Sequence, residues 1–289
     1  MNNEKSFPKV GINWFPGHMA KTRKQITEDL KMIDVVVEVL DARIPNSSQN
    51  PDIRKITDNK KKVIVLNKYD LADKNKTELW IEYFNKKGQK VVLADSLTGK
   101  GINETTRQIQ KIMEDDMQKM ADKGRIGRKI RVMIVGIPNV GKSSFINRIS
   151  KKTSAEVGNK PGVTKQKQWI RINDKIELLD TPGVLWPKFD DEEIGLKLAL
   201  LGAVRDEVVS IEDIALYACD WMMKNCPEAL TNYYQIEIQS TPYETLLTIG
   251  RKRGMLQGNE VDEDRLMKSF VKDIRDAKCG RITWEFPND

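Results

Sequence analysis

Short apolar, β-branched runs alternate along the chain with longer amphipathic stretches. Continuous apolar runs of this kind are typical of strands buried on both faces of a parallel sheet, and the stretches between them suit crossover helices. The pattern therefore predicts an α/β fold with a mostly parallel sheet. Its expected strands are Val35–Leu40, Val63–Leu66, Val91–Ala94, Ile130–Val135, Trp169–Ile172 and Ile176–Leu179.

After about residue 208 the strand signals give way to helical periodicity. Apolar residues at helical spacing predict two amphipathic helices, the second of which should end near Gly280, since glycine readily adopts the left-handed conformation that follows many helices. We therefore predict an α/β domain over residues 1–207, including an N-terminal segment over residues 1–30, and a small all-helical domain over residues 208–289. The two helix faces comprise Ile211, Ile214, Ala215, Ala218 and Met222 in the first and Leu266, Phe270, Ile274 and Ala277 in the second.

The composition suits a folded, water-soluble protein, because 39% of the 289 residues are hydrophobic and 31% are charged. No apolar run approaches the ~20 residues needed to cross a bilayer. The N-terminus also lacks the apolar stretch of a signal peptide. We therefore expect a cytoplasmic protein with no membrane partner. Cys219, Cys226 and Cys279 cannot all pair with one another, and we expect reduced thiols.

The net charge of +7 is distributed unevenly. Residues 208–289 carry 10 Lys and Arg against 14 Asp and Glu, a net charge of −4, which leaves +11 for residues 1–207. A positive field of this kind attracts polyanions, although surface lysines also serve solubility alone. The charge therefore permits a nucleic-acid partner without requiring one, and it favours the first two-thirds of the chain as the source of attraction.

A phosphate-binding motif follows the strand at Ile130–Val135. Gly136-Ile-Pro-Asn-Val-Gly-Lys-Ser143 fits the G-x-x-x-x-G-K-[ST] pattern and precedes a helical stretch, so backbone N–H groups and the helix N-terminus would face phosphate oxygens. Lys142 should act catalytically by bridging the β- and γ-phosphates, and Ser143 should hold Mg²⁺. The alternative is an ordinary strand-to-helix turn. The nucleotide-binding residues expected here are Asn139, Val140, Gly141, Lys142, Ser143 and Ser144.

A base-reading motif follows the strand at Val63–Leu66. Asn67-Lys68-Tyr69-Asp70 fits N-K-x-D, in which the Asp70 carboxylate would accept hydrogen bonds from N1–H and N2–H₂ of guanine. Adenine lacks this pair of donors and would leave a buried carboxylate unpaired, at a cost of roughly 1–3 kcal/mol. Lys68 would lie over the base, and Asn67 would hold the phosphate-binding loop. The alternative is a surface turn.

A weaker signal follows the strand at Val91–Ala94. Asp95-Ser96-Leu97-Thr98-Gly99-Lys100-Gly101 would form a turn whose backbone contacts the guanine carbonyl, with Asp95 and Ser96 as nucleotide-binding residues. A plain turn explains the same residues equally well.

Two further loops carry candidate groups for Mg²⁺ and the γ-phosphate. Asp180-Thr-Pro-Gly183 ends the strand Ile176–Leu179, so Asp180 would hold a Mg²⁺ water and the Gly183 N–H would bond the γ-phosphate. Upstream, Pro161-Gly-Val-Thr164 offers Thr164 as a second hydroxyl on Mg²⁺. Thr164 and Gly183 are therefore expected to take part in catalysis.

Together these elements resemble the TRAFAC-class GTPases, but in a permuted order. The usual order begins with the phosphate loop, whereas here N-K-x-D and Ser96 precede Gly136–Ser143. The same sheet can be built from a circularly permuted chain that is rejoined through residues 102–129. With the N-terminal Trp14-Phe-Pro-Gly-His-Met19 segment added, the whole chain resembles the ribosome biogenesis GTPase A family, bacterial permuted GTPases of large-subunit maturation.

The resemblance implies roles for two further residues. Val184 follows Gly183 where Ras-like enzymes carry a water-orienting Gln, and the family implies that catalytic His18 replaces it. Local packing or helix capping is the alternative for this single histidine. Asn139 resembles the residue that helps hold K⁺ in potassium-activated relatives, where the cation supplies positive charge. A turn-stabilising Asn is the alternative there.

For the helical domain the resemblance implies RNA contact. Lys268, Lys272 and Arg275 would share a helix face, Arg251-Lys-Arg253 form a basic cluster, and Trp284 and Phe286 could stack on bases. The net charge of −4 argues against this, and a solvated face is the alternative.

We therefore predict a Mg²⁺-dependent, K⁺-assisted GTPase that binds GTP and GDP. As a monomer, it would bind the precursor of the large (50S) ribosomal subunit and its rRNA with GTP, hydrolyse GTP faster on that particle, and leave after hydrolysis. One alternative is a GTP-gated RNA-binding switch with incidental hydrolysis. A second, a phosphotransferase acting on a small molecule, is disfavoured by N-K-x-D.

Overall fold

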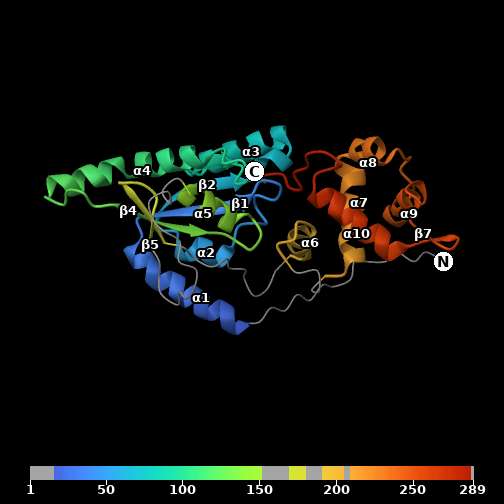
Figure 1. The fold of residues 1–289 in the computed structure, drawn as a ribbon, viewed down its shortest axis with the longest axis horizontal. Helices are drawn as coiled ribbons and strands as arrows, with labels where there is room; N and C mark the ends of the chain where they lie inside the picture. The colour runs from blue at the N-terminus through green and yellow to red at the C-terminus, as the bar shows by residue number, and fades with distance from the viewer. Residues whose placement is uncertain (1–15, 152–168, 180–190, 205–208, 288–289) are drawn as a thin grey trace. The chain divides into compact units, whose positions relative to one another are not determined.

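The computed structural model describes residues 16–151, 169–179, 191–204 and 209–287 (Figure 1). Six strands and their connecting helices are followed by a helical region. The elements in chain order are α1 (Pro16–Asp29), η1 (Leu30–Met32), β1 (Val35–Asp41), α2 (Pro51–Ile56), β2 (Lys61–Asn67), η2 (Tyr69–Leu71), α3 (Lys74–Lys86), β3 (Lys90–Ala94), α4 (Ile102–Asp122), β4 (Ile130–Val135), α5 (Lys142–Lys151), β5 (Trp169–Arg171), β6 (Ile176–Leu179), α6 (Glu192–Leu200), α7 (Ile211–Asn225), α8 (Pro227–Tyr234), α9 (Pro242–Lys252), β7 (Leu256–Gln257), β8 (Glu260–Val261) and α10 (Glu263–Arg275).

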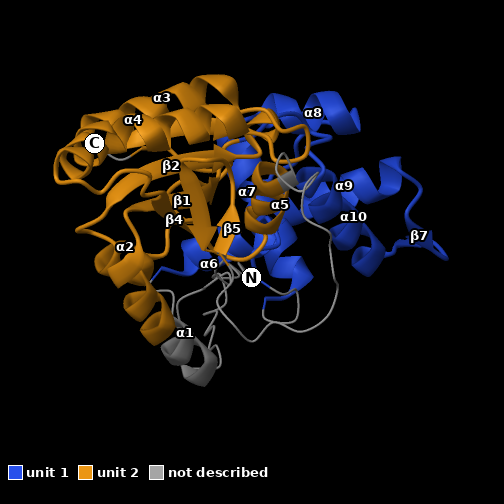
Figure 2. Ribbon diagram, turned by 60° about the vertical axis from the view of Figure 1, so that its left-hand side comes forward, with its two compact units in different colours: residues 1–14, 188–282 blue, residues 15–187, 283–289 orange. Residues whose placement is uncertain are grey.

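The chain divides into two compact units (Figure 2). One, here called the sheet unit, comprises residues 15–187 and 283–289. The other, the helical unit, contains residues 188–282 together with residues 1–14. This division differs from a boundary after residue 207, because α6 falls in the helical unit and the last residues return to the sheet unit. The helical unit is thus bounded by the sheet unit on both sides along the chain.

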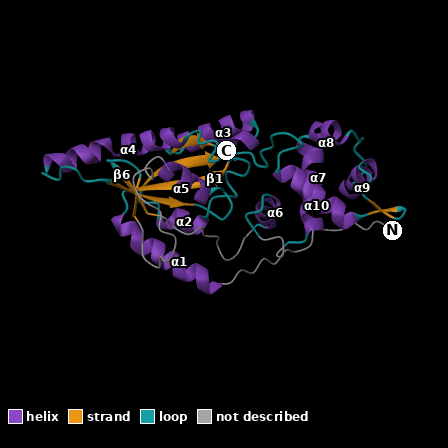
Figure 3. Ribbon diagram, viewed as in Figure 1, coloured by secondary structure: helices purple, strands orange, loops and turns teal. Residues whose placement is uncertain are grey.

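The sheet unit is built on six strands in the order β3-β2-β1-β4-β6-β5. Figure 3 draws strands in orange and helices in purple. The first five run parallel, and β5 pairs antiparallel with β6. All six strands were predicted, mostly from continuous apolar runs. Burial explains why that signal was clear in the centre of the sheet, where every residue of β1 is buried. The predicted mostly parallel α/β fold is confirmed.

Side-chain alternation divides the sheet core into two faces. On one face, Val36 of β1 packs with Ile26 of α1 and Ile53 of α2, while Leu40 packs with Trp80 and Phe84 of α3. Helices α4 and α5 contact strands β2, β3 and β4. Helices therefore cover the sheet, and the loops that follow the parallel strands lie at its carboxyl edge.

The helical unit is held together by α7, α9 and α10, which contact one another. The predicted apolar faces are buried, as Ile214, Met222 and Phe270 show. The predicted helix end near Gly280 is wrong. Helix α10 ends at Arg275, because the chain leaves the helix through Asp276 and the left-handed Ala277 (φ 54°) rather than through a glycine. The two-residue strands β7 and β8 add a small hairpin.

All three cysteines lie in the helical unit, and the prediction of unpaired thiols is confirmed. Burial raises the pKa of Cys219 to about 12 and that of Cys279 to about 11. Both thiols therefore stay protonated and unreactive near neutral pH. Among the helices the structure describes, none combines the length and apolar character of a membrane span.

Candidate functional site

The loops that carry the sequence motifs meet at one edge of the sheet. Because β3, β2, β1 and β4 are parallel neighbours, their carboxyl ends lie side by side. Asp95, Asn67, Asp41 and Gly136 begin or end the loops at these four strand ends. In open α/β sheets ligands bind outside the carboxyl ends of the strands. The topology therefore gathers two motifs that lie far apart in the sequence.

The phosphate-binding loop, Gly136–Ser143, depends on glycine at two positions. Gly141 has φ +89°, and a Cβ there would lie 2.2 Å from Asn67 Nδ2. A Cβ on Gly136 would lie 2.6 Å from the Val39 carbonyl oxygen. Asn139 also adopts a left-handed conformation (φ 61°), which asparagine tolerates better than most residues. The loop therefore has little room for other residue types at its two glycines.

Helix α5 begins within this loop and presents its N-terminal turn to the edge. Lys142 is buried with 8% exposure, whereas Ser143 and Ser144 are exposed. Unpaired backbone N–H groups and the positive end of the helix dipole make such an N-terminus favourable for phosphate. Arg148 of α5 donates from Nη2 to the Leu97 carbonyl at 2.7 Å, which joins the helix to the loop after β3.

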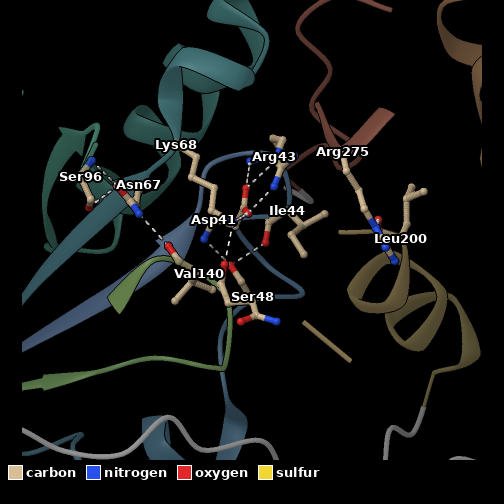
Figure 4. A network of polar contacts seen from close by, with 11 residues as sticks. Asp41, Arg43, Ile44, Ser48, Asn67, Lys68, Ser96, Val140, Leu200 and Arg275 are labelled. Atoms are coloured by element: carbon tan, nitrogen blue, oxygen red, sulfur yellow. Dashed lines mark hydrogen bonds and ion pairs between the residues drawn. The ribbon is translucent and has the colours of Figure 1, made fainter. Parts of the chain in front are cut away.

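Asn67 connects three loops through its side-chain amide (Figure 4). Its Nδ2 donates to the Val140 carbonyl at 2.7 Å, and its Oδ1 accepts from Ser96 N at 3.1 Å and from Ser96 Oγ at 2.7 Å. Only 1% of Asn67 is exposed. Asn67 thus makes the contact with the phosphate-binding loop that its motif predicts, and it fixes the loop after β3 at the same time.

Lys68 makes a second bridge between the two motifs. Its backbone is left-handed (φ 58°), and its Nζ donates to the Asn139 carbonyl at 2.6 Å and to Asp41 Oδ2 at 3.0 Å. The expectation that Lys68 covers the base stays a prediction. The observed contacts hold its ammonium group beside the phosphate-binding loop, with the N-K-x-D loop attached to that loop by Asn67 and Lys68 together.

Asp41, which contacts Lys68, also forms a buried ion pair with Arg43 (Figure 4). Arg43 donates from Nε to Asp41 Oδ1 at 3.0 Å and from Nη2 to Oδ2 at 2.8 Å, and its backbone N–H also bonds Oδ1 at 3.0 Å. Burial by itself would raise the pKa of Asp41, but the charges of Arg43 and Lys68 and the bonds from Arg43 outweigh it and hold that pKa well below its usual range. Asp41 is therefore an anion at any physiological pH.

Asp70 lies in the short helix η2 and is partly exposed. Burial tends to lower the pKa of Arg43, but the negative charge of Asp41 and, more weakly, that of Asp70 raise it. The Asp70 carboxylate therefore lies within electrostatic range of the Asp41–Arg43 pair. Its accessibility fits a carboxylate that accepts hydrogen bonds from a base edge.

Asp95 shapes its own loop. Its Oδ1 accepts from Leu97 N at 2.9 Å and Thr98 N at 3.2 Å, and its Oδ2 accepts from the Thr98 hydroxyl. Burial tends to raise the pKa of Asp95, but these bonds lower it below the usual value. The carboxylate is thus engaged within the turn, while the Ser96 backbone is held by Asn67. The hydrogen bonds of Asp95 therefore fix the conformation of this loop.

Several predicted site residues fall outside the described structure. Thr164, Asp180 and Gly183 lie outside the described residues, as does the side chain of His18, whose backbone belongs to α1. Ser143 and Asn139, the other predicted metal ligands, are exposed at the sheet edge. Within the described part of the chain, no group of three or more His, Cys, Asp or Glu is placed to hold a metal ion.

Sequence reasoning missed the Asp41–Arg43 pair. It also missed Glu285, which bonds Asn46 and Ser47 in the loop that follows β1. Asp41 is the last residue of the buried strand β1, as Asn67 is the last residue of β2, and the register pairs these two residues. That parallel position at the strand end was the available signal for Asp41. Glu285 had no such signal, because its partner Ser47 lies 238 residues away in the sequence.

Several of the proposed RNA-contacting residues are engaged elsewhere, among them Arg253, which pairs with Asp273. The suggestion that Trp284 stacks on bases is wrong, because it is 1% exposed and lies in the sheet unit. Arg275 bonds the Ala199 and Leu200 carbonyls at the end of α6, at 2.9 and 2.8 Å, which gives it a structural role. Phe286 is 50% exposed but also belongs to the sheet unit, with Lys76 above its ring. Lys268 and Lys272 remain exposed on α10.

Comparison with known proteins identifies close relatives over nearly the whole chain. Residues 131–249 match a family described as "50S ribosome-binding GTPase". The chain is 45% identical to "Ribosome biogenesis GTPase A" of Bacillus cereus over 280 residues, covering 96% of this chain and 95% of the relative. It is 34% identical to the protein of the same name from Thermotoga maritima, covering 96% and 95% of the two chains.

Solved structures show the same architecture. The crystal structure described as GNP-bound YlqF from T. maritima matches with a TM-score of 0.63 and 29% identity, over 93% of this chain and 99% of that chain. The GDP-bound structure of that protein matches with a TM-score of 0.64, over 92% and 100% of the two chains. The sheet and the helical region are therefore both shared with proteins solved with guanine nucleotides.

Proposed function

This chain belongs to the ribosome biogenesis GTPase A family, and from that membership we propose that it is a GTPase that assists assembly of the large (50S) ribosomal subunit in the cytoplasm. The bridge from the N-K-x-D loop to the phosphate-binding loop, Asn67 Nδ2 to Val140 O at 2.7 Å, carries this proposal. It joins the two halves of a guanine-nucleotide site that the permuted sequence separates.

The residues present suit a guanine nucleotide. The glycine-dependent loop and the N-terminus of α5 supply N–H groups for phosphate, and buried Lys142 supplies a positive charge. Partly exposed Asp70 supplies the carboxylate that would read N1–H and N2–H₂ of guanine. Asn67 and Lys68 hold these two parts together. Preference for GTP over ATP then rests on Asp70.

We extend the proposal to two cations. The exposed Ser143 hydroxyl at the first turn of α5 fits Mg²⁺, which takes few protein ligands and relies on phosphates and waters for the rest. Asp180 and Thr164 would complete that set. The exposed, left-handed Asn139 places an amide beside the loop, where it would help hold K⁺. When bound, such cations offset the charge that develops on the phosphates.

For the water attack we propose His18. Val184 offers no side-chain acceptor for a water, and a histidine can orient one or take its proton. The backbone of His18 lies in the first turn of α1, within the sheet unit. Substituting His18→Ala should lower stimulated turnover about 100-fold, within the range for a general base, while GDP affinity changes by less than about twofold. Retained turnover would reject this role.

The remaining proposal concerns the cycle. The GTP-bound protein would bind the immature 50S particle and its rRNA, with the positive charge of residues 1–207 supplying phosphate attraction and Lys268 and Lys272 adding contacts. Hydrolysis would then release the protein, which acts as a monomer. Turnover would stay low until the particle completes the site.

The decisive experiment measures GTP turnover with purified immature 50S, mature 50S, or no particle, in K⁺ and in Na⁺. We expect particles to raise turnover at least tenfold and Na⁺ to lower it. Lys142→Ala, which removes the phosphate-binding charge, is the control for contaminating GTPases. Unstimulated turnover with intact particle binding would instead support a GTP-gated RNA-binding switch. ATP binding as tight as GTP binding would contradict the assignment of Asp70.

A further inference from the structure

Residues 283–286, here called the C-terminal strap, rejoin the sheet unit after the helical unit ends at residue 282. Trp284 is fully buried, and its backbone N–H donates to the Arg43 carbonyl at 2.8 Å. The Thr283 hydroxyl accepts from Asp73 N at 3.1 Å, and Trp80 Nε1 donates to the Glu285 carbonyl at 3.3 Å. The strap is therefore fastened both to α3 and to the loop that follows β1.

The Glu285 side chain is the contact of most consequence. It is 5% exposed, and its carboxylate accepts from Asn46 N at 2.7 Å, from Ser47 N at 3.0 Å and from the Ser47 hydroxyl. Bonds from backbone N–H groups to an ionised carboxylate are among the stronger hydrogen bonds in proteins. A buried carboxylate bonded in this way fixes the position of the turn that donates to it.

That turn is also bonded to Asp41, which forms the ion pair with Arg43. Ser48 Oγ donates to the Ile44 carbonyl at 2.7 Å and accepts from Asp41 N at 3.1 Å. The strap thus holds residues 43–48 at both ends, through Trp284 at Arg43 and through Glu285 at Asn46 and Ser47. Asp41 in turn bonds Lys68 Nζ at 3.0 Å, and Lys68 bonds the Asn139 carbonyl in the phosphate-binding loop.

We propose that Glu285 is a positioning residue for guanine-nucleotide binding, acting through the turn at residues 43–48 and Asp41 to hold Lys68 against the phosphate-binding loop. The inference rests on the proposed function only in placing a guanine nucleotide at this edge of the sheet. Lys68 is 24% exposed at its side chain and has a long, flexible stem. Its pose therefore depends on the carboxylate that anchors it, and Glu285 keeps that carboxylate in place.

The alternative is that the strap only stabilises the sheet unit, and a double-mutant cycle separates the two. The dissociation constant of a fluorescent N-methylanthraniloyl derivative of GDP is measured for the full chain, Glu285→Ala, Lys68→Ala and the double variant. We expect Glu285→Ala to weaken binding about tenfold in the wild-type background but less than about twofold beside Lys68→Ala. Independent, purely structural effects would multiply instead.

Two further measurements accompany the cycle. The KM for GTP should rise with the dissociation constant, while kcat at saturating GTP stays within about twofold, because Glu285 bonds Asn46, Ser47 and Trp80 and would act through them. Glu285→Gln, which keeps one acceptor oxygen for the turn, should show an intermediate loss of affinity. Glu260→Gln removes a carboxylate at an exposed position of the helical unit and should change neither quantity.

Unchanged GDP affinity in Glu285→Ala, or equal losses in both backgrounds, would overturn the inference while leaving GTP binding by the wild-type chain intact. Failure of the wild-type chain to bind GDP would overturn the proposed function itself. If Glu285→Ala does not fold, the same cycle with Glu285→Gln decides, with thermal melting of each variant confirming a folded state.

Discussion

Each unit of this molecule contains a buried aspartate held by two cations, and the two differ in what the cations reach. In the sheet unit, Asp41 pairs with Arg43 and Lys68, and Lys68 also bonds the phosphate-binding loop. In the helical unit, Asp273 of α10 pairs with Arg253 at 2.6 Å and Lys278 at 3.0 Å, with Tyr234 as a further partner. The carboxylates are equally buried, with 4% of each side chain exposed.

The two carboxylates match in burial and in the number of cations that pair with them, so the functional difference lies in connectivity. The contacts of Asp273 tie α10 to α8 and to the residue that follows α9, all within one helical unit. Those of Asp41 continue through Lys68 to Asn139 in a loop built for phosphate. A buried ion pair is weak evidence for function by itself. Attachment to that loop through Lys68 is what links Asp41 to the proposed nucleotide site.

The largest expected effect comes from removing each carboxylate in turn. Asp41→Ala removes the carboxylate that pairs with Arg43, whose side chain is 5% exposed, and should lower the free energy of unfolding by about 3–5 kcal/mol. GDP affinity should fall at least tenfold. Asp273→Ala should cost less stability, because its cations Arg253 and Lys278 are more exposed, and should leave GDP affinity unchanged. Urea unfolding and GDP titration check both; equal GDP losses would erase the contrast.

A third buried carboxylate, Glu38 in the middle of β1, sharpens the comparison because it forms no salt bridge with any residue that the structure describes. Burial raises the pKa of Glu38 to about 7, against lesser opposing effects of Lys62 and Arg54. The folded state then binds the proton more tightly than the unfolded state, so the contribution of Glu38 to stability is greatest below pH 4.5 and is lost as pH rises through about 7. At about 1.4 kcal/mol per pKa unit, the loss is on the order of 3 kcal/mol.

Glu38→Gln should therefore be more stable than the wild type at pH 8, with the advantage shrinking as pH falls from 7 to 4.5. Urea unfolding at several pH values measures this difference. Asp41 should show no comparable loss as pH rises through this range, because its pKa lies below the usual value. A pH-independent difference for Glu38→Gln would contradict the buried, proton-binding state.

A smaller effect separates the two units through their glycines. Gly141→Ala forces a side chain into left-handed backbone, 2.2 Å from Asn67 Nδ2, and should weaken GDP binding about 30-fold, equivalent to roughly 2 kcal/mol. Gly254→Ala in the helical unit also has positive φ (+64°) but meets nothing within 4 Å. It should cost about 1 kcal/mol of stability and leave GDP affinity unchanged. Titration and thermal melting check the pair.

The sequence predicted most of the sheet and one half of the site. The strands were recognisable because parallel, doubly buried strands are continuous apolar runs, as Val63–Leu66 shows. The Asn67 contact followed from motif chemistry. Asp41 and Arg43 were missed because an acidic and a basic residue after a strand resemble ordinary surface charge until the neighbouring loops are placed around them.

The C-terminal residues show why the remainder was out of reach. Trp284 was taken for an exposed stacking residue, since no local pattern reveals that residues 43 and 284 touch. The end of α10 was misplaced because Ala277 adopts the left-handed conformation usually given to glycine, a choice made by tertiary context. Long-range pairing and local strain of this kind leave no periodic trace.

Residues 188–282 of the helical unit are an insertion in the covalent sense, because the chain leaves the sheet unit at residue 187 and re-enters it at residue 283. A stop codon placed to delete the helices would also remove Trp284, whose side chain is buried, and would leave a cavity in the sheet unit. Deleting these helices while keeping Trp284 instead requires removing residues 188–282 and joining the two flanking ends of the sheet unit. Otherwise, a loss of nucleotide binding in a C-terminally shortened protein would be attributed to the missing helices when its cause is the missing Trp284 of the sheet unit.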